Sequence, residues 1–252
     1  MAKKIKVTVV TPVLNGAKTI ERCIRSVQNQ SYVDIEHIVI DGDSTDGTQC
    51  IVNKMGVRLI SELDAGIYDA FNKGIAAASG DVIHILNADD YYHNTKVIDD
   101  SVKAIEKYDA DICHGLVEQV DSEGNFVWQV GIDTEKKHLM KKMKVAHPSM
   151  FVRRSVYEKF GNYSVGFKIA ADHEFVLRVW DKVKVTYIDK PFCKMSIGGV
   201  STSNVEKSYR ESAAARLMHG GGLITTVLNY LWQVYKHKYL VEPMRKMGYR
   251  RK

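Results

Sequence analysis

The sequence predicts an α/β protein in which a mostly parallel sheet carries helices on both faces. Before Ile112, β-rich and almost continuously apolar runs alternate with segments whose apolar residues recur at helical spacing. The 252 residues are 45% hydrophobic and 26% charged, the composition of a globular chain that can bury one large core. The sequence contains no run of about 18 apolar residues, so no segment is expected to cross a bilayer.

The expected elements of the first half follow one another regularly. Residues 5–11 form an apolar, β-rich run typical of a strand buried on both faces. Within residues 17–30, one helix face is marked by Ile20, Cys23, Ile24 and Val27. The same rhythm predicts strands over 35–41, 57–61 and 82–87, and helices over 48–54, 67–78 and 95–107.

A different pattern follows Ile112. Residues 112–120 and 125–130 predict a hairpin around a turn at 122–124. A domain boundary near residue 110 would fit this change, although no Pro- or Ser-rich linker marks one. The remaining expected elements are strands over 149–153, 183–188 and 192–195 and helices over 171–181, 209–218 and 223–238.

Cysteine usage and the N-terminus indicate a cytosolic chain. The four cysteines are far apart and include no Cys-x-x-Cys pair, so buried, reduced thiols are expected rather than a metal site or a disulfide framework. The first residues run directly into a strand-like pattern, without the apolar stretch and small-residue cleavage site of a secretory signal.

The positive charge is concentrated at the C-terminal end. The whole chain carries 36 Lys or Arg against 30 Asp or Glu, a net charge of +6. From Val205 onward there are ten basic and three acidic residues, so this segment has a net charge of +7 and the first 204 residues sum to −1. A nearly neutral body offers no basic face to nucleic acid, which is therefore not an expected partner.

Polar residues gather at the ends of three predicted strands, at 11–16, 41–47 and 87–90. Ligands of an open parallel sheet bind beyond the carboxyl ends of its strands, so three such ends at one edge predict a cleft. Any one of them alone could instead be a turn that caps the next helix.

Asp89 and Asp90 directly follow an apolar strand. Adjacent carboxylates suit Mg²⁺ or Mn²⁺, although such a pair is also common on surfaces.

Two common nucleotide motifs are missing. Neither G-x-G-x-x-G nor G-x-x-x-x-G-K-S/T follows the first strand, which argues against a dinucleotide enzyme and a P-loop ATPase. Gly220, Gly221 and Gly222 do not follow a strand, and they predict a joint rather than a phosphate cradle.

Seven short motifs in a fixed order carry a resemblance to a known family. The chain resembles family 2 glycosyltransferases of the GT-A fold, particularly those that assemble bacterial exopolysaccharides, O-antigens and colanic-acid-type polymers. The similarity extends over about residues 5–204. The motifs are VVTPVLN (9–15), IVIDGDSTDGT (38–48), SELDAGIYDAFNKG (61–74), LNADD (86–90), HPSMF (147–151), ADHEF (171–175) and GGVS (198–201).

The resemblance implies a donor site in the first half of the chain. Members of this family bind a nucleotide-diphospho-sugar, with a UDP-sugar as the default. Asp89 and Asp90 match the family's metal motif and would hold Mn²⁺ or Mg²⁺ against the diphosphate. Lys73 could approach the diphosphate, or it could be a solvated helix lysine. By similarity, the donor-binding residues are Thr11, Pro12, Asn15, Asp41, Asp43, Asp64, Asn72, Lys73 and Asp89.

The resemblance also assigns a catalytic role to Asp172. It matches the family's base, which would take the proton of the acceptor hydroxyl while that oxygen attacks the anomeric carbon with inversion. Its place at the start of a predicted helix favours the ionised form, and a simple N-terminal cap is the alternative. His147 would face the donor pocket unless it is an ordinary loop histidine. A loop with Gly198, Gly199 and Ser201 would close near the acceptor or the diphosphate, although a plain turn suits the glycines equally.

Three departures from the family pattern leave the identity of the donor nucleotide open between a uridine and a guanosine nucleotide. Leu14 stands where tyrosine is commoner, and Asn87 replaces an aspartate at the start of the metal motif. The second motif has Asp-Gly-Asp-Ser at residues 41–44, where Asp-Asp-Gly-Ser is commoner. The departures do not affect the metal pair, Asp89 and Asp90, or the catalytic base, Asp172.

The resemblance therefore predicts a metal-dependent, inverting hexosyltransferase that uses a glycan or lipid-linked acceptor in bacterial surface polysaccharide synthesis. Residues 1–204 would be the catalytic domain, with about 1–110 binding the nucleotide sugar and about 111–204 the acceptor. The alternatives are a metal-dependent nucleotidyltransferase and a non-catalytic nucleotide-sugar-binding or scaffold protein. The sugar, the linkage and the oligomeric state are not predicted.

Residues 205–252 form an amphipathic, aromatic-bearing and basic tail. Such a segment suits the surface of an anionic membrane, which would place a cytoplasmic enzyme peripherally at the inner face of the cell membrane. Equally, the tail could pack on the domain and leave a solvated basic end.

Overall fold

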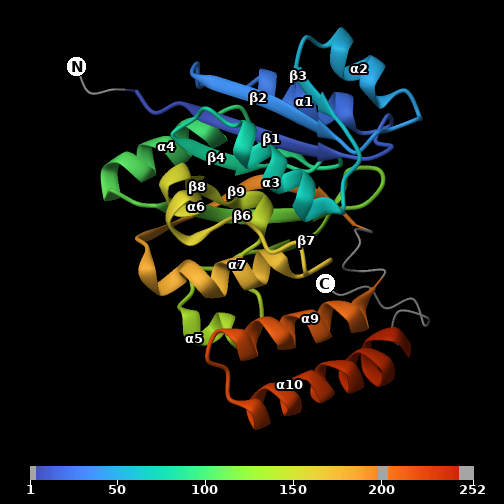
Figure 1. Ribbon diagram of the computed structural model, residues 1–252, viewed down its shortest axis with the longest axis vertical. Coiled ribbons are helices and arrows are strands. Elements are labelled where there is room, and N and C mark those ends of the chain that lie inside the picture. The colour runs from blue at the N-terminus through green and yellow to red at the C-terminus, as the bar shows by residue number, and fades with distance from the viewer. Residues whose placement is uncertain (1–3, 198–203, 244–252) are drawn as a thin grey trace.

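The computed structural model describes residues 4–197 and 204–243. Its first half contains four parallel strands connected by helices (Figure 1). β1 pairs with β2 on one side and with β4 on the other, and β2 pairs with β3. This half confirms the predicted parallel sheet. The four strands are β1 (Val7–Val13), β2 (Ile35–Asp41), β3 (Arg58–Ser61) and β4 (Val82–Ile85).

The second half extends the same sheet with mixed pairing. β8 (Phe151–Arg153) is antiparallel to β4, and β6 (Ile112–Val120) is antiparallel to β8. β6 forms the expected hairpin with β7 (Phe126–Val130) and pairs in parallel with β9 (Val185–Ser196). The two-residue strand β5 (Tyr91–Tyr92) completes the order β3-β2-β1-β4-β8-β6-β9-β5.

Some elements differ from the sequence prediction. β9 is one continuous strand where two brief strands are expected, because it shifts register against β6 near Gly115 instead of ending. Glycine is required there, since a Cβ would lie 2.7 Å from the ring of Phe192. β5 and the short helices α5 (Lys136–Leu139) and α6 (Arg154–Phe160) are not predicted, because they are too short to show a period.

Helices cover both faces of the sheet and create two main cores. α3 (Ile67–Ala77), α6 and α7 (Ala171–Val179) pack on one face. α1 (Ile20–Gln28) and α4 (Val97–Tyr108) pack on the other, with α2 (Thr48–Lys54) beside α1. Side chains of β2 alternate between the faces, with Ile38 and Ile40 in the first core and Val39 in a smaller cluster with α1 and α2 on the opposite face. Burial on both sides explains the continuous apolar runs.

The C-terminal segment forms a helical hairpin at the end of the molecule remote from β3 (Figure 1). α9 (Val205–Met218) packs on α7 and places Ala215 in the core of the body. After the glycine joint, α10 (Leu223–Lys236) packs on α9 and continues as a π-helical turn, His237–Val241. The segment after residue 204 therefore contributes to the core of the body through α9, and the domain boundary at residue 204 stays a prediction.

Two global expectations concern membranes and thiols. No helix within residues 4–197 and 204–243 has both the length and the apolarity needed to cross a membrane. The thiols of Cys23, Cys113 and Cys193 are buried and that of Cys50 is exposed, and all four are free.

Candidate active site

The parallel strands bring the three predicted polar strand ends to one edge of the sheet. β1, β2 and β4 are neighbours and run in the same direction, so the segments after Val13, Asp41 and Ile85 leave the sheet on the same side. In parallel sheets this is the side on which ligands bind. This edge is the candidate active site.

The first two loops at this edge are cross-linked by hydrogen bonds. Asn15 N–H donates to Ser44 Oγ at 2.7 Å, and Asn15 Oδ1 accepts from Thr45 N–H at 3.0 Å. Asn15 and Asp43 have φ of 52° and 67°, in the left-handed region that these residue types tolerate better than most. The side chain of Asn15 therefore holds the shape of the loops, while the side chain of Asp43 is exposed at the edge.

Asp41 is a buried carboxylate at the end of β2. Its Oδ2 accepts from Ser44 N–H at 3.0 Å, from Gln49 Nε2 at 2.9 Å and from Ser61 Oγ at 2.8 Å. Its Oδ1 is also buried and has no hydrogen-bond partner within the described parts of the chain. A buried carboxylate oxygen without a donor costs free energy, so this atom is a candidate for contact with a ligand.

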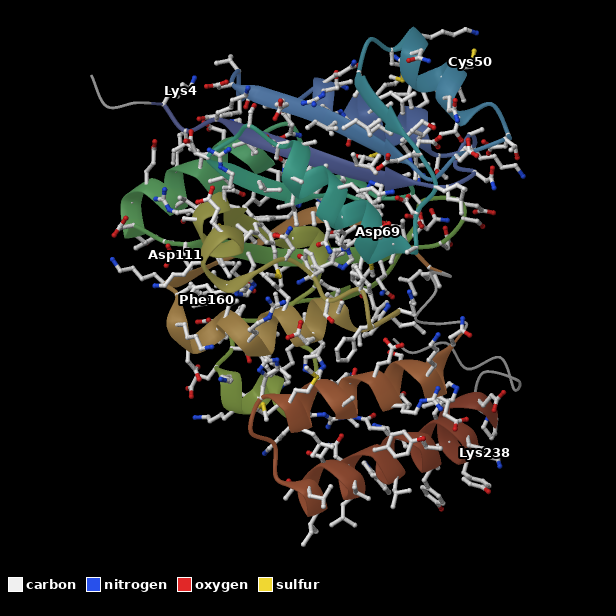
Figure 2. All side chains as sticks on the ribbon, in the orientation of Figure 1. Lys4, Cys50, Asp69, Asp111, Phe160 and Lys238 are labelled. Atoms are coloured by element: carbon white, nitrogen blue, oxygen red, sulfur yellow. The ribbon has the colours of Figure 1, made fainter. Side chains whose placement is uncertain are left out.

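Lys73 and Asp64 belong to a charged cluster beside these loops. Lys73 Nζ donates to Asp64 Oδ1 at 2.7 Å, and it lies 3.2 Å from Glu62 and 3.5 Å from Asp69, which is labelled on α3 in Figure 2. The hydrogen bond to Asp64 raises the pKa of Lys73 above its usual range. Asp64 also borders Gly42, where a Cβ would lie 2.9 Å from Asp64 Oδ2. Lys73 is thus held among carboxylates and is not a solvated helix lysine.

Three of the predicted donor residues direct their side chains into the fold. Thr11 is fully buried, with its Oγ1 3.0 Å from His37 Nε2. Pro12 is buried in β1 beyond the last residue that pairs with β4, where its missing N–H interrupts no ladder. Asn72 donates from Nδ2 to Tyr163 O at 2.8 Å and accepts from Tyr163 N–H at 3.0 Å. Asn72 therefore braces α3 against the segment before α7, and its contact with the donor stays a prediction.

Asn87 and Asp90 present two unpartnered oxygen atoms next to Asp89. Asp90 is only 1% exposed, and its burial together with the carboxylate of Asp89 raises the pKa of Asp90 well above its ordinary value. Asp90 Oδ2 accepts from Asn87 Nδ2 at 3.3 Å. Asp90 Oδ1 and Asn87 Oδ1 are buried and have no hydrogen-bond partner among the residues described.

A divalent cation fits this donor set. The cation would place positive charge beside the buried carboxyl group of Asp90. Mg²⁺ and Mn²⁺ prefer hard oxygen ligands such as those of Asp90 and Asn87. Within residues 4–197 and 204–243, no group of three or more His, Cys, Asp or Glu side chains could hold a metal. A cation here would therefore need oxygen atoms from water or from a substrate as further ligands.

Asp172 lies at the N-terminal end of α7 with three groups around its carboxylate. Its Oδ1 accepts from His173 N–H at 2.8 Å and lies 3.3 Å from Tyr68 Oη, while its Oδ2 lies 3.7 Å from His147 Nδ1. Burial by itself would raise the pKa of Asp172, but His147 and the N–H of His173 outweigh it and hold that pKa below its usual range. A general base requires this ionised form.

His147 connects the predicted base to the predicted metal pair. Its Nε2 lies 3.4 Å from Asn87 Nδ2, while its Nδ1 faces Asp172. Because the amide nitrogen of Asn87 is a donor, Nε2 is the acceptor and the ring proton sits on Nδ1, toward Asp172. Asp90, Asn87, His147 and Asp172 form one continuous row, which we call the catalytic row.

Two neighbours of the site are missed by the sequence analysis. Tyr68 donates to Ile169 O at 2.7 Å and faces Asp172, and burial raises its pKa well above the usual range. Arg22 Nη2 donates to the carbonyl oxygen of Asp89 at 2.9 Å. Tyr68 lies within the motif at 61–74, which could have singled it out, whereas Arg22 belongs to none of the motifs and carries no sequence signal. The predicted loop residues Gly198, Gly199 and Ser201 lie outside the described residues.

The chain has the GT-A fold. It is similar to S. aureus TarS 1–349 in complex with UDP-GlcNAc, with a TM-score of 0.69 and 18% identity over 94% of this chain and 73% of that one. It is also similar to the mannosyltransferase PcManGT from Pyrobaculum calidifontis in complex with GDP-Man and Mn²⁺, with a TM-score of 0.65 and 18% identity over 94% and 71% of the two chains. At these identities the likeness shows the fold alone.

Sequence comparison gives the family. Residues 8–161 match the profile of "Glycosyl transferase family 2". An uncharacterized glycosyltransferase of Mycobacterium tuberculosis (strain ATCC 25618 / H37Rv) is 33% identical over 220 residues, which cover 82% of this chain and 79% of the relative. A PGL/p-HBAD biosynthesis glycosyltransferase of M. tuberculosis (strain ATCC 25177 / H37Ra) is 28% identical over 212 residues, 80% and 81% of the two chains. The chain belongs to glycosyl transferase family 2.

Proposed function

We propose that this protein transfers a hexosyl unit from a nucleotide-diphospho-sugar to a hydroxyl group, with inversion at the anomeric carbon. The catalytic row carries the proposal, because it sets an ionised carboxylate beside oxygen donors suited to a divalent cation. Attack by a hydroxyl and departure of a nucleoside diphosphate need these two features side by side. Membership of the family supports the same class of reaction.

We infer that the nucleotide lies over the ends of β1 and β2. Asp41 Oδ1 is a buried acceptor that an N–H group of the base would satisfy. Asp43 and Asp64 border the same edge and are proposed to contact the ribose, with Lys73 holding Asp64 in place. A UDP-sugar remains the default donor and a GDP-sugar the second choice. TarS 1–349 in complex with UDP-GlcNAc and PcManGT in complex with GDP-Man give one donor of each kind.

In the proposed mechanism Asp172 takes the proton of the acceptor hydroxyl as that oxygen attacks the anomeric carbon. His147 orients Asp172 and keeps it ionised through its Nδ1–H. Asp89 and Asp90, with Asn87 Oδ1, would hold Mn²⁺ or Mg²⁺. That ion supplies positive charge where the leaving diphosphate gains negative charge. The transition state is oxocarbenium-like, as in glycoside hydrolysis.

We further propose that about residues 1–110 bind the donor and about 111–204 the acceptor, with α9 as part of the same catalytic unit. The acceptor would be a glycan or a lipid-linked glycan of the bacterial surface. The enzyme would work peripherally at the inner face of the cell membrane. One relative is named for PGL/p-HBAD biosynthesis, which is consistent with a biosynthetic transferase.

Calorimetric titration with UDP and with GDP, each with and without Mn²⁺, tests the donor site. We expect one of the two to bind, with an affinity at least about tenfold higher when Mn²⁺ is present, because the cation joins the diphosphate to a buried carboxylate. Turnover should release a nucleoside diphosphate. Release of pyrophosphate would instead identify a nucleotidyltransferase, and binding of neither nucleotide to the folded protein would favour a scaffold.

A further inference from the structure

Helix α10 turns its polar face toward α9. At this contact Thr226 is 3% exposed, and Asn229 Oδ1 accepts from Arg216 Nη1 at 2.6 Å. Beyond the end of α10, the ring of His237 lies 6.3 Å from the ring of Tyr209. A helix that packs on a protein through the hydrophobic effect has the opposite orientation, with its apolar stripe inward.

The opposite face of α10 is an apolar stripe that points away from the rest of the molecule (Figure 2). Its side chains recur every three or four residues, and nothing within residues 4–197 and 204–243 covers them: Ile224 is 75% exposed and Leu228 is 61% exposed. The rings of Trp232, Tyr235 and Tyr239 follow one another with centroids 5.9 Å and 5.0 Å apart. The α10 stripe consists of Ile224, Leu228, Leu231, Trp232, Tyr235 and Tyr239.

Positive charge surrounds one end of the α10 stripe. Lys236 and Lys238 lie there, and Figure 2 shows Lys238 at the outer end of the hairpin. In the sequence, residues 244–252, which lie outside the described part of the chain, contain five more Lys or Arg and no acidic residue. A second copy of this chain would bring the same excess charge to the stripe and be repelled by it. An anionic lipid surface instead offers opposite charge and an apolar layer together.

We propose that the α10 stripe is the surface by which this enzyme docks on an anionic membrane. The helix lies in the plane of the interface, with the stripe at the boundary of headgroups and acyl chains and the lysines against the headgroups. The tail does pack on the body through α9, but within residues 4–197 and 204–243 nothing covers the apolar stripe of α10. This surface gives a location to the peripheral contact proposed above, and its test requires no catalytic turnover.

Co-sedimentation with lipid vesicles tests the docking surface. The wild-type protein should bind vesicles that contain phosphatidylglycerol and should bind pure phosphatidylcholine vesicles much more weakly. The double substitution Leu228→Ser with Trp232→Ser should reduce the bound fraction at least about tenfold, because it removes two large apolar side chains from the stripe. The matched control is Val33→Ser, which removes an even more exposed apolar side chain from the body and should leave binding unchanged.

Two results would overturn the docking surface. One is equal vesicle binding by the double variant and the wild type. The other is a wild-type dimer in solution that the double variant converts to a monomer, which would make a second copy the occupant. Nucleotide binding should be the same in every variant, so the docking surface can fail while the donor site stands.

A second inference concerns the segment that leads into the predicted base. Glu211 on α9 accepts hydrogen bonds from three successive main-chain N–H groups, those of residues 168–170, at 2.8 to 3.0 Å from its Oε2. Successive N–H groups that converge on one anion form a nest. The carbonyl group of Ile169 in the same segment accepts from Tyr68, so the segment is held on both sides. α7 begins at the next residue, and Asp172 is its second residue.

We infer that Glu211 is a positioning residue for Asp172. It lies one turn before Ala215, which is fully buried in the core that α9 shares with α7. By fixing residues 168–170, Glu211 sets where α7 starts and so where the carboxylate of Asp172 lies relative to His147. Glu211 touches none of the reacting groups. The inference rests on the proposed function, since it matters only if Asp172 is the base.

Kinetics of donor hydrolysis, with water as acceptor, test this role. Release of UDP from UDP-N-acetylglucosamine and of GDP from GDP-mannose would be followed. Glu211→Ala should lower kcat at least about tenfold while the KM for the donor stays within about twofold, since a displaced catalytic group affects the chemical step. Glu211→Gln should recover most of the rate, because its amide oxygen still accepts the N–H groups. Glu206→Ala removes an exposed carboxylate of the same helix and is the matched control.

An unchanged kcat in Glu211→Ala, or equal losses in kcat and in donor affinity, would overturn the positioning role. If Asp172→Asn abolishes hydrolysis and Glu211→Ala does not, this inference fails by itself. If Asp172→Asn also leaves the rate unchanged, the proposed function fails as well.

Discussion

Replacing Asp172 with asparagine should lower kcat by about 10²- to 10⁴-fold, the usual contribution of a general base. The amide cannot accept the proton of the acceptor hydroxyl, whereas its oxygen can still accept the His173 N–H that Asp172 Oδ1 accepts. Nucleotide affinity should therefore stay within about twofold of wild type, because the loss is confined to the transition state. Steady-state release of nucleoside diphosphate, paired with calorimetry, measures both quantities.

Asp181→Asn is the control for this substitution. Asp181 lies just past the end of α7, more than half exposed, and pairs with Lys136 at the surface. The control should match the wild type in kcat and in unfolding temperature. Normal turnover by Asp172→Asn would remove Asp172 from the mechanism.

Since the pKa of Asp172 lies below its ordinary value, its ionisation should also not limit the rate between about pH 5 and 8.

Replacing Asp90 with asparagine should have two opposite effects. Mn²⁺-dependent nucleotide binding should weaken by about 100-fold or more, because the substitution removes the buried carboxylate that balances the cation. The metal-free protein should become more stable by about 1 to 3 kcal/mol, because the neutral amide avoids the cost of burying an ionisable carboxyl group beside Asp89, the cost that raises the pKa of Asp90. Each kcal/mol corresponds to roughly 2–4 °C in the unfolding temperature of a chain of this size.

Thermal unfolding with and without Mn²⁺ separates these two effects. Mn²⁺ should stabilise the wild type but not Asp90→Asn. Asp109→Asn, at an exposed helix end, should behave like the wild type in both conditions. A variant that keeps Mn²⁺-dependent affinity would show that the carboxylate pair does not hold the ion. A less stable metal-free variant would show that the charge of Asp90 is already balanced.

Local patterns predict the first half of the fold well. β2 and α2 have the predicted bounds, because their apolar periodicity and flanking turn residues agree. The second half is predicted less completely, since its mixed pairing depends on contacts between distant segments. β5 has only two residues, and its partner Cys193 lies about a hundred residues further along the chain.

The candidate site divides in the same way. Acidic residues at strand ends and the start of a helix are visible in sequence, and the family motifs single out Asp90 and Asp172. The contacts that join them are not visible. His147 lies 60 residues from Asn87, and Tyr68 lies 104 residues from Asp172. The sequence also cannot reveal that the side chain of Asn72 is hydrogen-bonded to the main chain of Tyr163, or that Lys73 is hydrogen-bonded to Asp64.

The sequence by itself determined the class of fold, the family and the amphipathic character of the tail, and it predicted the carboxylates of the candidate site. Composition, periodicity and motif order are local properties, and the chain alone carries them. Only the tertiary structure decided that α9 packs on α7 and that α10 turns its apolar stripe outward. It also placed Glu211 where it accepts the main-chain N–H groups just before α7 and Asp172. A periodic pattern shows that a helix has an apolar face, but what covers that face depends on which distant segment packs against the helix.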